Sequence, residues 1–392
     1  MSILRNILRA DLKCIRVFLV NLVWKGARTF TRFDRERKKG SAFPAFQFIS
    51  VTNKCNLTCQ GCWVSQTDGI RELELQKVDR IIRDSNENGS WFFGILGGEP
   101  LLYPKLTSVF KAHPRSYFQL FTNGMLLNDA MAEELRQCAN VTPLISFEGD
   151  EPVADIRRGG SGVYKRTLRA IETSVSHGLI TGVAISVCKS NIEMALSESF
   201  VDMLHRLGVV YLWYYIYRPV GAQPCYELAL SAHEIERLRR FLVEGRTKYP
   251  MVIIDSYWDA DGRPFCPAAE GLSHHINPDG HIEPCPVIQY SCGVVGEENL
   301  KTTYQKSAFL RNLKAGIHNK TNGCILMENP AWLTDLAAEH HAQNTSGRPG
   351  MDEQLKAGCK VCSHGECPVI PERNGLYRFA KRRAFFGLGA YG

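Results

Sequence analysis

The sequence has no long uninterrupted apolar run, although 44% of its 392 residues are hydrophobic. The most apolar stretch near the amino end, residues 17–24, is far shorter than the roughly 20 residues that span a bilayer. It contains Asn21 and no small-residue cleavage site follows it, so it does not resemble a secretory signal. Low-complexity segments and internal repeats are also missing. We therefore expect a folded cytoplasmic protein without membrane-spanning helices.

Net charge is nearly absent from most of the chain. The total is +7, but residues 1–40 alone carry +8 and the remainder sums to −1. This distribution excludes a basic groove across the whole protein, and we expect no nucleic-acid partner. The basic amino end instead predicts attraction to an anionic surface such as a membrane.

Residues 3–24 predict one amphipathic helix. Basic residues lie off its apolar stripe, which comprises Leu4, Leu8, Leu12, Ile15, Leu19 and Leu22. Such a helix can lie in a membrane interface, which would make the protein peripheral on the inner face of the membrane. It can equally pack against the catalytic domain or a partner subunit, and the pattern leaves both readings open. Residues 376–392 form a second basic, aromatic segment.

From residue 46 onward, short apolar strands alternate with amphipathic helices. The expected strands are 46–51, 91–96, 117–121, 142–147, 182–187 and 210–217, and the expected helices are 74–87, 104–112, 129–137, 163–177 and 194–207. Six such units predict an α/β fold, a partial (β/α)6 TIM-type barrel with a Cys-rich C-terminal extension. A helix at 232–248 and a strand at 251–255 lead out of the barrel.

Three parts follow from this pattern. Residues 1–44 are the basic amphipathic segment, 45–257 the barrel and 258–392 the extension. The extension predicts only short regular pieces, with metal supplying part of its stability.

The chain has fourteen cysteines, and most are clustered. In a reducing cytoplasm such clusters indicate metal ligands rather than disulfides. Cys55, Cys59 and Cys62 follow the first expected strand with the spacing C-x3-C-x2-C. Seven more lie in the extension: Cys266, Cys285, Cys292, Cys324, Cys359, Cys362 and Cys367.

The three-cysteine loop predicts a catalytic [4Fe–4S] cluster. Three thiolates from one loop bind three irons and leave the fourth iron open for an outside ligand. A structural zinc or cluster site would need a fourth protein ligand, and no adjacent residue offers one.

With this loop the chain resembles the radical SAM superfamily. The resemblance implies that the open iron binds the amino and carboxylate groups of S-adenosylmethionine (SAM). It also implies that one electron cleaves SAM to methionine and a 5′-deoxyadenosyl radical, with flavodoxin or ferredoxin as the reductant. Gly97, Gly98, Glu99 and Pro100, after the second strand, resemble the GGEP motif that holds the SAM amino group. The glycines allow close approach of the backbone, and the carboxylate accepts hydrogen bonds from an ammonium group.

Further polar residues at strand ends match the family's SAM contacts. They are Thr122 and Asn123 of a TNG turn, Ser146 and Glu148 where relatives carry S-x-D-G, Arg158 or its neighbour Arg157, Ser186 and Asn191. Strand C-terminal ends are where barrel enzymes place their active sites. Each of these residues can also be a helix cap or a turn residue.

One position departs from the family. Relatives usually carry an aromatic residue immediately before the third cysteine, near the adenine, whereas this chain has Gly61 there and Trp63 after the cysteine. The hopanoid-modifying branch carries a similar glycine. We expect Trp63 to supply the missing stacking surface.

The extension resembles the SPASM region of radical SAM enzymes, which binds auxiliary [4Fe–4S] clusters. Cys266, Gly280 and Cys285 fit C-x13-G-x4-C, but the last three cysteines lack the fourth partner of the family pattern. At least one auxiliary cluster is expected from the seven cysteines, with zinc as the alternative. The nearby histidines, His274 and His275 among them, are expected to be solvent or turn residues.

The substrate remains open between two classes. The basic terminal segments and Gly61 favour a lipid or another membrane-associated substrate. The SPASM resemblance favours a peptide- or protein-modifying enzyme of the maturase type, although no winged-helix peptide-recognition domain is evident. A non-catalytic iron–sulfur protein is the third alternative. Only about 45 residues precede the first strand, too few for a cobalamin domain.

Overall fold

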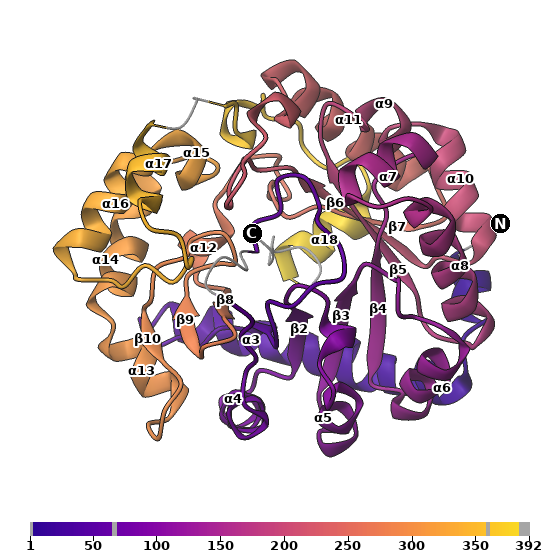
Figure 1. The fold of residues 1–392 in the computed structure, drawn as a ribbon, viewed down its shortest axis with the longest axis horizontal. Coiled ribbons are helices and arrows are strands. Elements are labelled where there is room, and N and C mark those ends of the chain that lie inside the picture. Colours follow the sequence, from indigo (N-terminus) through magenta and orange to yellow (C-terminus); the bar gives the residue numbers. More distant parts are fainter. Residues whose placement is uncertain (1–2, 65–68, 358–360, 384–392) are drawn as a thin grey trace.

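The computed structural model describes residues 3–64, 69–357 and 361–383, and one ten-stranded sheet organises them (Figure 1). Its order is β10-β9-β8-β1-β2-β3-β4-β5-β6-β7, with parallel pairing from β8 through to β7. The barrel strands are β1 (Phe46–Ser50), β2 (Phe92–Leu96), β3 (Tyr117–Thr122), β4 (Val141–Ser146), β5 (Gly182–Val187), β6 (Tyr211–Ile216) and β7 (Val252–Ile254). The predicted partial α/β barrel is confirmed.

Helices cover the outside of the curved sheet (Figure 1). They are α4 (Leu75–Glu87), α5 (Leu106–Ala112), α6 (Asp129–Cys138), α8 (Val163–Ser176), α10 (Glu198–Leu207) and α11 (Ala232–Lys248). Polar caps define their starts: the Asn128 side chain accepts from the Met131 amide, and Ser231 forms a capping box with Glu234. The single helix expected over 194–207 is two, because Ser197 caps α10 after the short α9 (Ile192–Ala195). Sequence reasoning missed α7 (Glu151–Arg158), which Asp150 caps.

The amino-terminal segment is not the single helix that its apolar stripe predicts. It divides into α1 (Ile3–Ile7), α2 (Leu12–Val17), the π-helical η1 (Phe18–Trp24) and α3 (Lys25–Arg37). The break occurs at Asp11, whose side chain accepts from the Lys13 amide at 2.8 Å while its own amide donates to the Gly178 carbonyl. The buried Asn6 donates to the His205 and Val209 carbonyls, which fixes α1 to the barrel.

This segment closes the end of the barrel where the strands begin. Phe30 and Phe33 of α3 join a buried aromatic cluster with Phe46, Phe92 and Tyr117 at the starts of β1, β2 and β3. Packing against the barrel, one of the two readings, is therefore confirmed for this side of the segment. The other side stays exposed, including Leu4, Leu8, Leu12 and Leu19 of the predicted stripe. Among the described residues, no helix combines the length and apolarity that crossing a membrane requires.

The extension contains short strands and helices that continue the sheet and the core of the barrel. Strand β8 (Ser273–Ile276) pairs in parallel with β1, and β9 (His281–Glu283) and β10 (Gly293–Val294) continue the sheet. Helices α12 (Pro267–Glu270), α13 (Leu300–Lys306), α14 (Ala308–Gly316), α15 (Ile325–Glu328), α16 (Pro330–Glu339) and α17 (Met351–Ala357) follow the barrel. None of these elements is longer than ten residues, as the expectation of short regular pieces requires, and their buried apolar side chains belong to the same core as the barrel. The division at residue 258 stays a proposal.

A buried ionic cluster fixes the carboxyl end to the barrel. Arg239 and Arg246 of α11, Asp255 after β7, Glu372, and Lys381 of α18 (Gly375–Arg383) are each at most 5% exposed. The Glu372 Oε1 atom lies 2.8 Å from Arg239 Nη1 and 3.1 Å from Lys381 Nζ, and it also pairs with Arg246. Lys381 Nζ lies 3.1 Å from Asp255 Oδ2, which Arg246 contacts too.

This cluster predicts a loss of stability in acid. Burial alone would raise the pKa of Asp255 and Glu372, but Lys381, Arg246 and Arg239 outweigh it and hold both pKa values below their ordinary 3.8 and 4.5. Groups with a depressed pKa stabilise the fold fully above their unfolded values and lose that contribution as pH falls through the folded values. We expect a melting temperature that is flat above about pH 5 and drops steeply below about pH 4. A melting temperature unchanged between pH 5 and pH 3 would contradict this.

Candidate active site

The cysteine loop and the GGEP turn are bonded to each other at the C-terminal ends of β1 and β2. The Gly98 amide donates to the Thr52 carbonyl and the Glu99 amide to the Lys54 carbonyl, both at 2.8 Å. A Cβ on Gly97, whose φ is +149°, would lie 2.2 Å from the Thr52 oxygen, and one on Gly98 would lie 2.3 Å from the Lys54 oxygen. The glycines thus permit close approach to the cysteine loop itself.

The three thiols of the loop lie close enough to interact electrostatically. Burial, followed by the charge of Cys59, raises the pKa of the Cys55 thiol. Within the described ranges, no three His, Cys, Asp or Glu side chains are arranged around a single metal ion. A four-iron cluster binds each thiolate to a different iron, so its ligands lie farther apart than those of one ion. One loop with three neighbouring thiols fits such a cluster.

Glu99 is fully buried beside this loop. Its Oε1 accepts from Thr122 Oγ1 at 2.7 Å and from the Leu101 amide at 3.0 Å, and its Oε2 accepts from the Asn123 amide at 2.7 Å. Burial raises its pKa despite these donors. Pro100 begins the single turn that follows, and the TNG turn is thereby fixed to the GGEP turn.

Asn123 reaches from that turn into the cysteine loop. Its Nδ2 donates to Asn56 Oδ1 at 2.8 Å and lies 3.9 Å from the Cys55 sulfur. The first cysteine and the ends of β2 and β3 therefore form one bonded unit.

Glu148 and two arginines lie on the opposite side of the cysteine loop. Arg158 Nη2 is 2.7 Å from Glu148 Oε1, and Arg157 Nη2 is 3.5 Å from Oε2. Arg158 Nη1 also lies 3.6 Å from the Cys59 sulfur. Helix α7 places these arginines, and the Gln60 amide donates to the Arg157 carbonyl at 2.8 Å. The unpredicted helix is what fixes the cysteine loop from this side.

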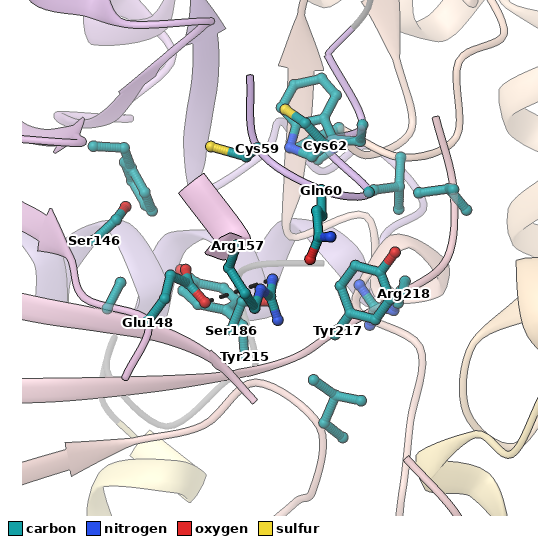
Figure 2. A pocket seen from close by; sticks show the side chains of 18 of the residues that line it. Cys59, Gln60, Cys62, Ser146, Glu148, Arg157, Ser186, Tyr215, Tyr217 and Arg218 are labelled. Atoms are coloured by element: carbon teal, nitrogen blue, oxygen red, sulfur yellow. Dashed lines mark ion pairs between the residues drawn. The ribbon is translucent and has the colours of Figure 1, made fainter. Parts of the chain in front are cut away.

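A cavity of about 280 Å³ opens between these groups (Figure 2). Predicted residues on its wall are Cys59, Cys62, Trp63, Ser146, Glu148, Arg158 and Ser186. Sequence reasoning missed others that line it, among them Gln60, Tyr215, Tyr217, Arg218, Tyr257, Pro286 and Val287. The barrel strands and the start of the extension thus share one cavity.

Several predicted ligand contacts lie outside this cavity wall. Cys55, Gly97, Gly98, Glu99, Pro100, Thr122 and Asn123 form the adjoining turns already described, and Asn191 is not part of the wall. The Asn191 side chain donates to the Glu148 carbonyl at 2.9 Å and to the Ser186 carbonyl at 3.0 Å, and it accepts from the Cys188 amide. Its polar atoms brace the turn after β5.

Tyr217 explains the glycine that precedes the third cysteine. A Cβ built on Gly61, whose φ is +64°, would lie 1.9 Å from the Tyr217 hydroxyl oxygen. The aromatic ring that follows β6 therefore occupies the space beside the loop. Figure 2 shows Tyr217 facing the cavity near Gln60 and Arg218. No signal in the sequence links Gly61 to a residue so distant along the chain.

Trp63 lies on the other side of the loop. Its ring meets His275 edge to face at 5.6 Å between centroids. His275 is 2.7 Å from Ser50 Oγ and 2.6 Å from Glu283 Oε2, and all of these partners are buried. The expectation that His274 and His275 are solvent or turn residues was wrong, because β8 places both inside the sheet.

The cysteines of the extension separate into groups. Cys266, Cys285 and Cys324 are buried and interact electrostatically with one another and with Arg218. Burial, with Cys324 next, raises the pKa of Cys266 to about 11, and burial and Cys266 raise that of Cys285 to about 12. These three thiols adjoin the cavity through Arg218.

The remaining cysteines have different neighbours. Cys292 lies near Lys314 and Glu283 but also interacts electrostatically with Cys285, whereas Cys367 lies near Arg239 and Glu236. Cys362 is half-buried, and Cys359 lies outside the described residues. Cys367 is therefore separate from the group around Cys285, and Cys292 adjoins that group.

Comparisons with known proteins agree with this geometry. Residues 49–195 match the sequence model of the Radical SAM superfamily, a family whose members use a [4Fe–4S] cluster and SAM. The AdoMet-dependent heme synthase of Oleidesulfovibrio alaskensis is 22% identical over 325 residues, which cover 72% of this chain and 83% of that protein. The sporulation killing factor maturation protein SkfB of Bacillus subtilis is 24% identical over 274 residues, or 66% of this chain and 64% of SkfB.

Solved structures show the same fold. Streptococcus suis SuiB bound to S-adenosylmethionine has a TM-score of 0.61 at 18% identity, covering 74% of this chain and 71% of SuiB. The enzyme anSMEcpe with bound AdoMet has a TM-score of 0.54 at 17% identity, covering 67% of this chain and 78% of anSMEcpe. SuiB has also been solved with its precursor peptide SuiA.

Proposed function

Because the chain is a radical SAM enzyme with a SPASM-like extension, we propose that it modifies a peptide or protein substrate by hydrogen abstraction. The main support for this proposal is the cavity between the barrel and the extension, because both the cysteine loop and several aromatic side chains line it. SkfB is named as a maturation protein and SuiB binds a precursor peptide, and both resemble this chain over most of its length.

We assign the SAM-binding roles to the two sides of the cysteine loop. Cys55, Cys59 and Cys62 would hold the cluster, which when bound supplies the electron that cleaves SAM. Glu99 keeps acceptor capacity beyond its three donors, which suits an ammonium group. Arg158, already beside Cys59, suits the SAM carboxylate, and Glu148 orients that guanidinium.

The aromatic wall would hold the adenine and the substrate. Trp63 remains our candidate for stacking on adenine, and Tyr217 is a second one because it fills the space beside Gly61. Tyr215, Tyr257 and Val287 give the opposite part of the cavity an apolar surface suited to a hydrophobic side chain. Exclusion of water by this surface would protect a reactive radical from side reactions.

Formation of 5′-deoxyadenosine tests the substrate class. The anaerobically reconstituted full chain would receive SAM, dithionite and either a library of short peptides or vesicles of bacterial lipid extract. We expect peptides to raise the rate of 5′-deoxyadenosine formation, with a mass change in at least one peptide. Stimulation by lipid alone, with lipid modification, would overturn the proposal. Because radical SAM chemistry generally needs a reductant, flavodoxin replaces dithionite in a second series.

The lipid substrate predicted from the terminal segments is less favoured. The amino-terminal segment and α18, which contacts α3, lie where the barrel strands begin, whereas the cavity lies where the strands end. Residues 384–392 of the second basic segment lie outside the described residues. A basic, apolar surface at one end of the barrel therefore gives no reason for a lipid in the cavity at the other.

We propose that Cys266, Cys285 and Cys324 supply three ligands of one auxiliary cluster. Their electrostatic interaction with one another and with Arg218 supports this assignment, since a cation near the thiolates offsets their charge. Cys359 and Cys362 are candidates for the fourth ligand. Cys292, which interacts with Cys285, is a further candidate, whereas Cys367 has separate surroundings.

Iron content distinguishes the two groups of thiols. We expect Cys324→Ser to lose about four irons per chain, one cluster's worth, after anaerobic reconstitution. The matched substitution Cys367→Ser should retain them, because that buried thiol lies near Arg239 and Glu236 instead. Equal iron loss in both variants would contradict the assignment.

A further inference from the structure

A second, larger cavity lies at the end of the barrel opposite the active site. It has a volume of about 800 Å³ and is formed by η1, α3, the end of α4 and the residues that precede β2 and β3. Its lining shares no residue with the active-site cavity. In the ribbon, α3 passes behind the barrel strands in this region (Figure 1).

The lining is strongly basic. Five cations and no Asp or Glu contribute to it: Lys25, Arg28, Arg32, Arg35 and Arg115. Within the described part of the chain, only Arg32 among them has a carboxylate within ion-pair distance, Glu36 at 2.8 Å. The other four like charges repel one another, and a bound anion would relieve that repulsion.

Lys25 is one example of this charge repulsion. Its ammonium lies 4.6 Å from the centre of the Trp91 ring and donates to the Arg115 carbonyl, while the Arg115 guanidinium lies 5.3 Å from the same ring. Partial burial and the Arg115 charge lower the pKa of Lys25. The Trp91 ring therefore interacts with both cations, in a cavity that no acidic side chain lines.

Exposed apolar side chains adjoin this cavity. On η1, the exposed fractions are 51% for Leu19, 45% for Val20, 42% for Val23 and 56% for Trp24, and Trp24 itself is on the cavity rim. Arg28 stacks on the Trp24 ring at 4.7 Å. Tryptophan, arginine and apolar residues together are typical of the boundary between lipid headgroups and acyl chains.

The carboxyl-terminal helix also reaches this end of the barrel. Helix α18 contacts α3, and it carries the exposed Leu376 and Phe379. Two chain ends far apart in sequence thus bring exposed apolar residues to one end of the barrel. Nucleic acid would use the charge of such a surface but not its aliphatic side chains.

We propose that this end of the barrel docks on an anionic membrane surface, with a lipid phosphate bound in the cavity lined by Lys25, Arg28, Arg32, Arg35 and Arg115. The side chains of Leu19, Val20, Val23 and Trp24 enter the headgroup boundary. The active-site cavity, at the other end of the strands, then faces away from the bilayer. Docking therefore locates the enzyme without requiring a lipid substrate.

Vesicle flotation of the full chain tests the proposal. We expect binding to phosphatidylcholine vesicles that contain phosphatidylglycerol, little binding to pure phosphatidylcholine, and loss of binding as salt rises. Arg28→Ala with Arg115→Ala should weaken the partition about 25-fold, from the loss of two cations near the surface. Leu19→Ser with Val23→Ser should weaken it about tenfold through the lost apolar contact.

The matched control removes two charges elsewhere. Lys105→Ala with Lys320→Ala lowers the net charge equally at exposed positions away from this cavity and should bind vesicles like the unaltered protein. All variants should retain 5′-deoxyadenosine formation, which shows that they fold. Equal weakening by the control pair, or no binding to anionic vesicles, would overturn the proposal. Two other results obtained without vesicle binding would also overturn it. One is thermal stabilisation by inorganic phosphate, and the other is binding of an oligonucleotide or polyglutamate that depends on Arg28 and Arg115.

Discussion

Replacing Cys55, Cys59 and Cys62 together with alanine is expected to reduce reductive SAM cleavage by at least ~10³-fold, to the level of reductant alone. Without the three thiolates the cluster has no protein ligands on this loop, and the iron that would bind SAM is lost with it. The measurements are 5′-deoxyadenosine by chromatography and iron content after anaerobic reconstitution. Iron should fall by about four per chain while any auxiliary cluster remains.

Isolated thiols provide the control for that experiment. Cys138→Ala with Cys225→Ala removes two half-buried cysteines that lie outside both cysteine groups and should leave iron content and SAM cleavage unchanged. Normal SAM cleavage by the triple variant would refute the assignment of the loop. Melting temperatures of both variants separate loss of the cluster from loss of the fold.

Neutralising Glu372 is expected to cost about 3–5 kcal/mol of unfolding free energy. Glu372→Gln keeps the shape of the side chain but leaves Arg239, Arg246 and Lys381 buried with one carboxylate, Asp255, instead of two. Chemical denaturation measures the loss, and limited proteolysis should cut the carboxyl end sooner because Glu372 pairs with Arg239 and Arg246 of α11. The acid-dependent drop in melting temperature should also become shallower, since one of its two depressed carboxyls is gone.

The same helix provides a matched control. Glu236→Gln breaks an exposed ion pair with Arg240 on α11 and should cost less than about 1 kcal/mol. Similar losses from the two substitutions would show that the buried cluster is no more important than a surface pair.

The barrel was predictable because its signal is local and repeated. Expected strands and observed strands agree to within two residues, since each strand is a short apolar run between polar turns. The prediction of a single amino-terminal helix was wrong because a tertiary contact divides it. Its apolar residues recur at helical spacing without interruption, which favours one helix. The helix is divided at Asp11, whose side chain caps α2 and whose amide donates to the Gly178 carbonyl of the barrel. The second bond can form only when the barrel is folded.

The candidate site was predictable only where its residues follow strand ends. Motifs after β1 to β5 meet because parallel strands bring their C-terminal ends to one edge. Tyr217 and Arg218 follow β6 without a recognisable motif, and the grouping of Cys266, Cys285 and Cys324 depends on how the extension folds back. Spacing alone joined Cys367 to that group, whereas its side chain lies among other partners.

The pairing of β8 with β1 has a consequence for dividing this chain. Strand β1 leads directly into the cysteine loop, and its two neighbours are β2 from the barrel and β8 from the extension. A shortened protein that ended near residue 258 would present β1 as an open hydrogen-bonding edge, which invites pairing with other chains. Exchange of the extension between relatives would therefore have to carry β8 with it or risk self-association at the strand that leads to the iron ligands.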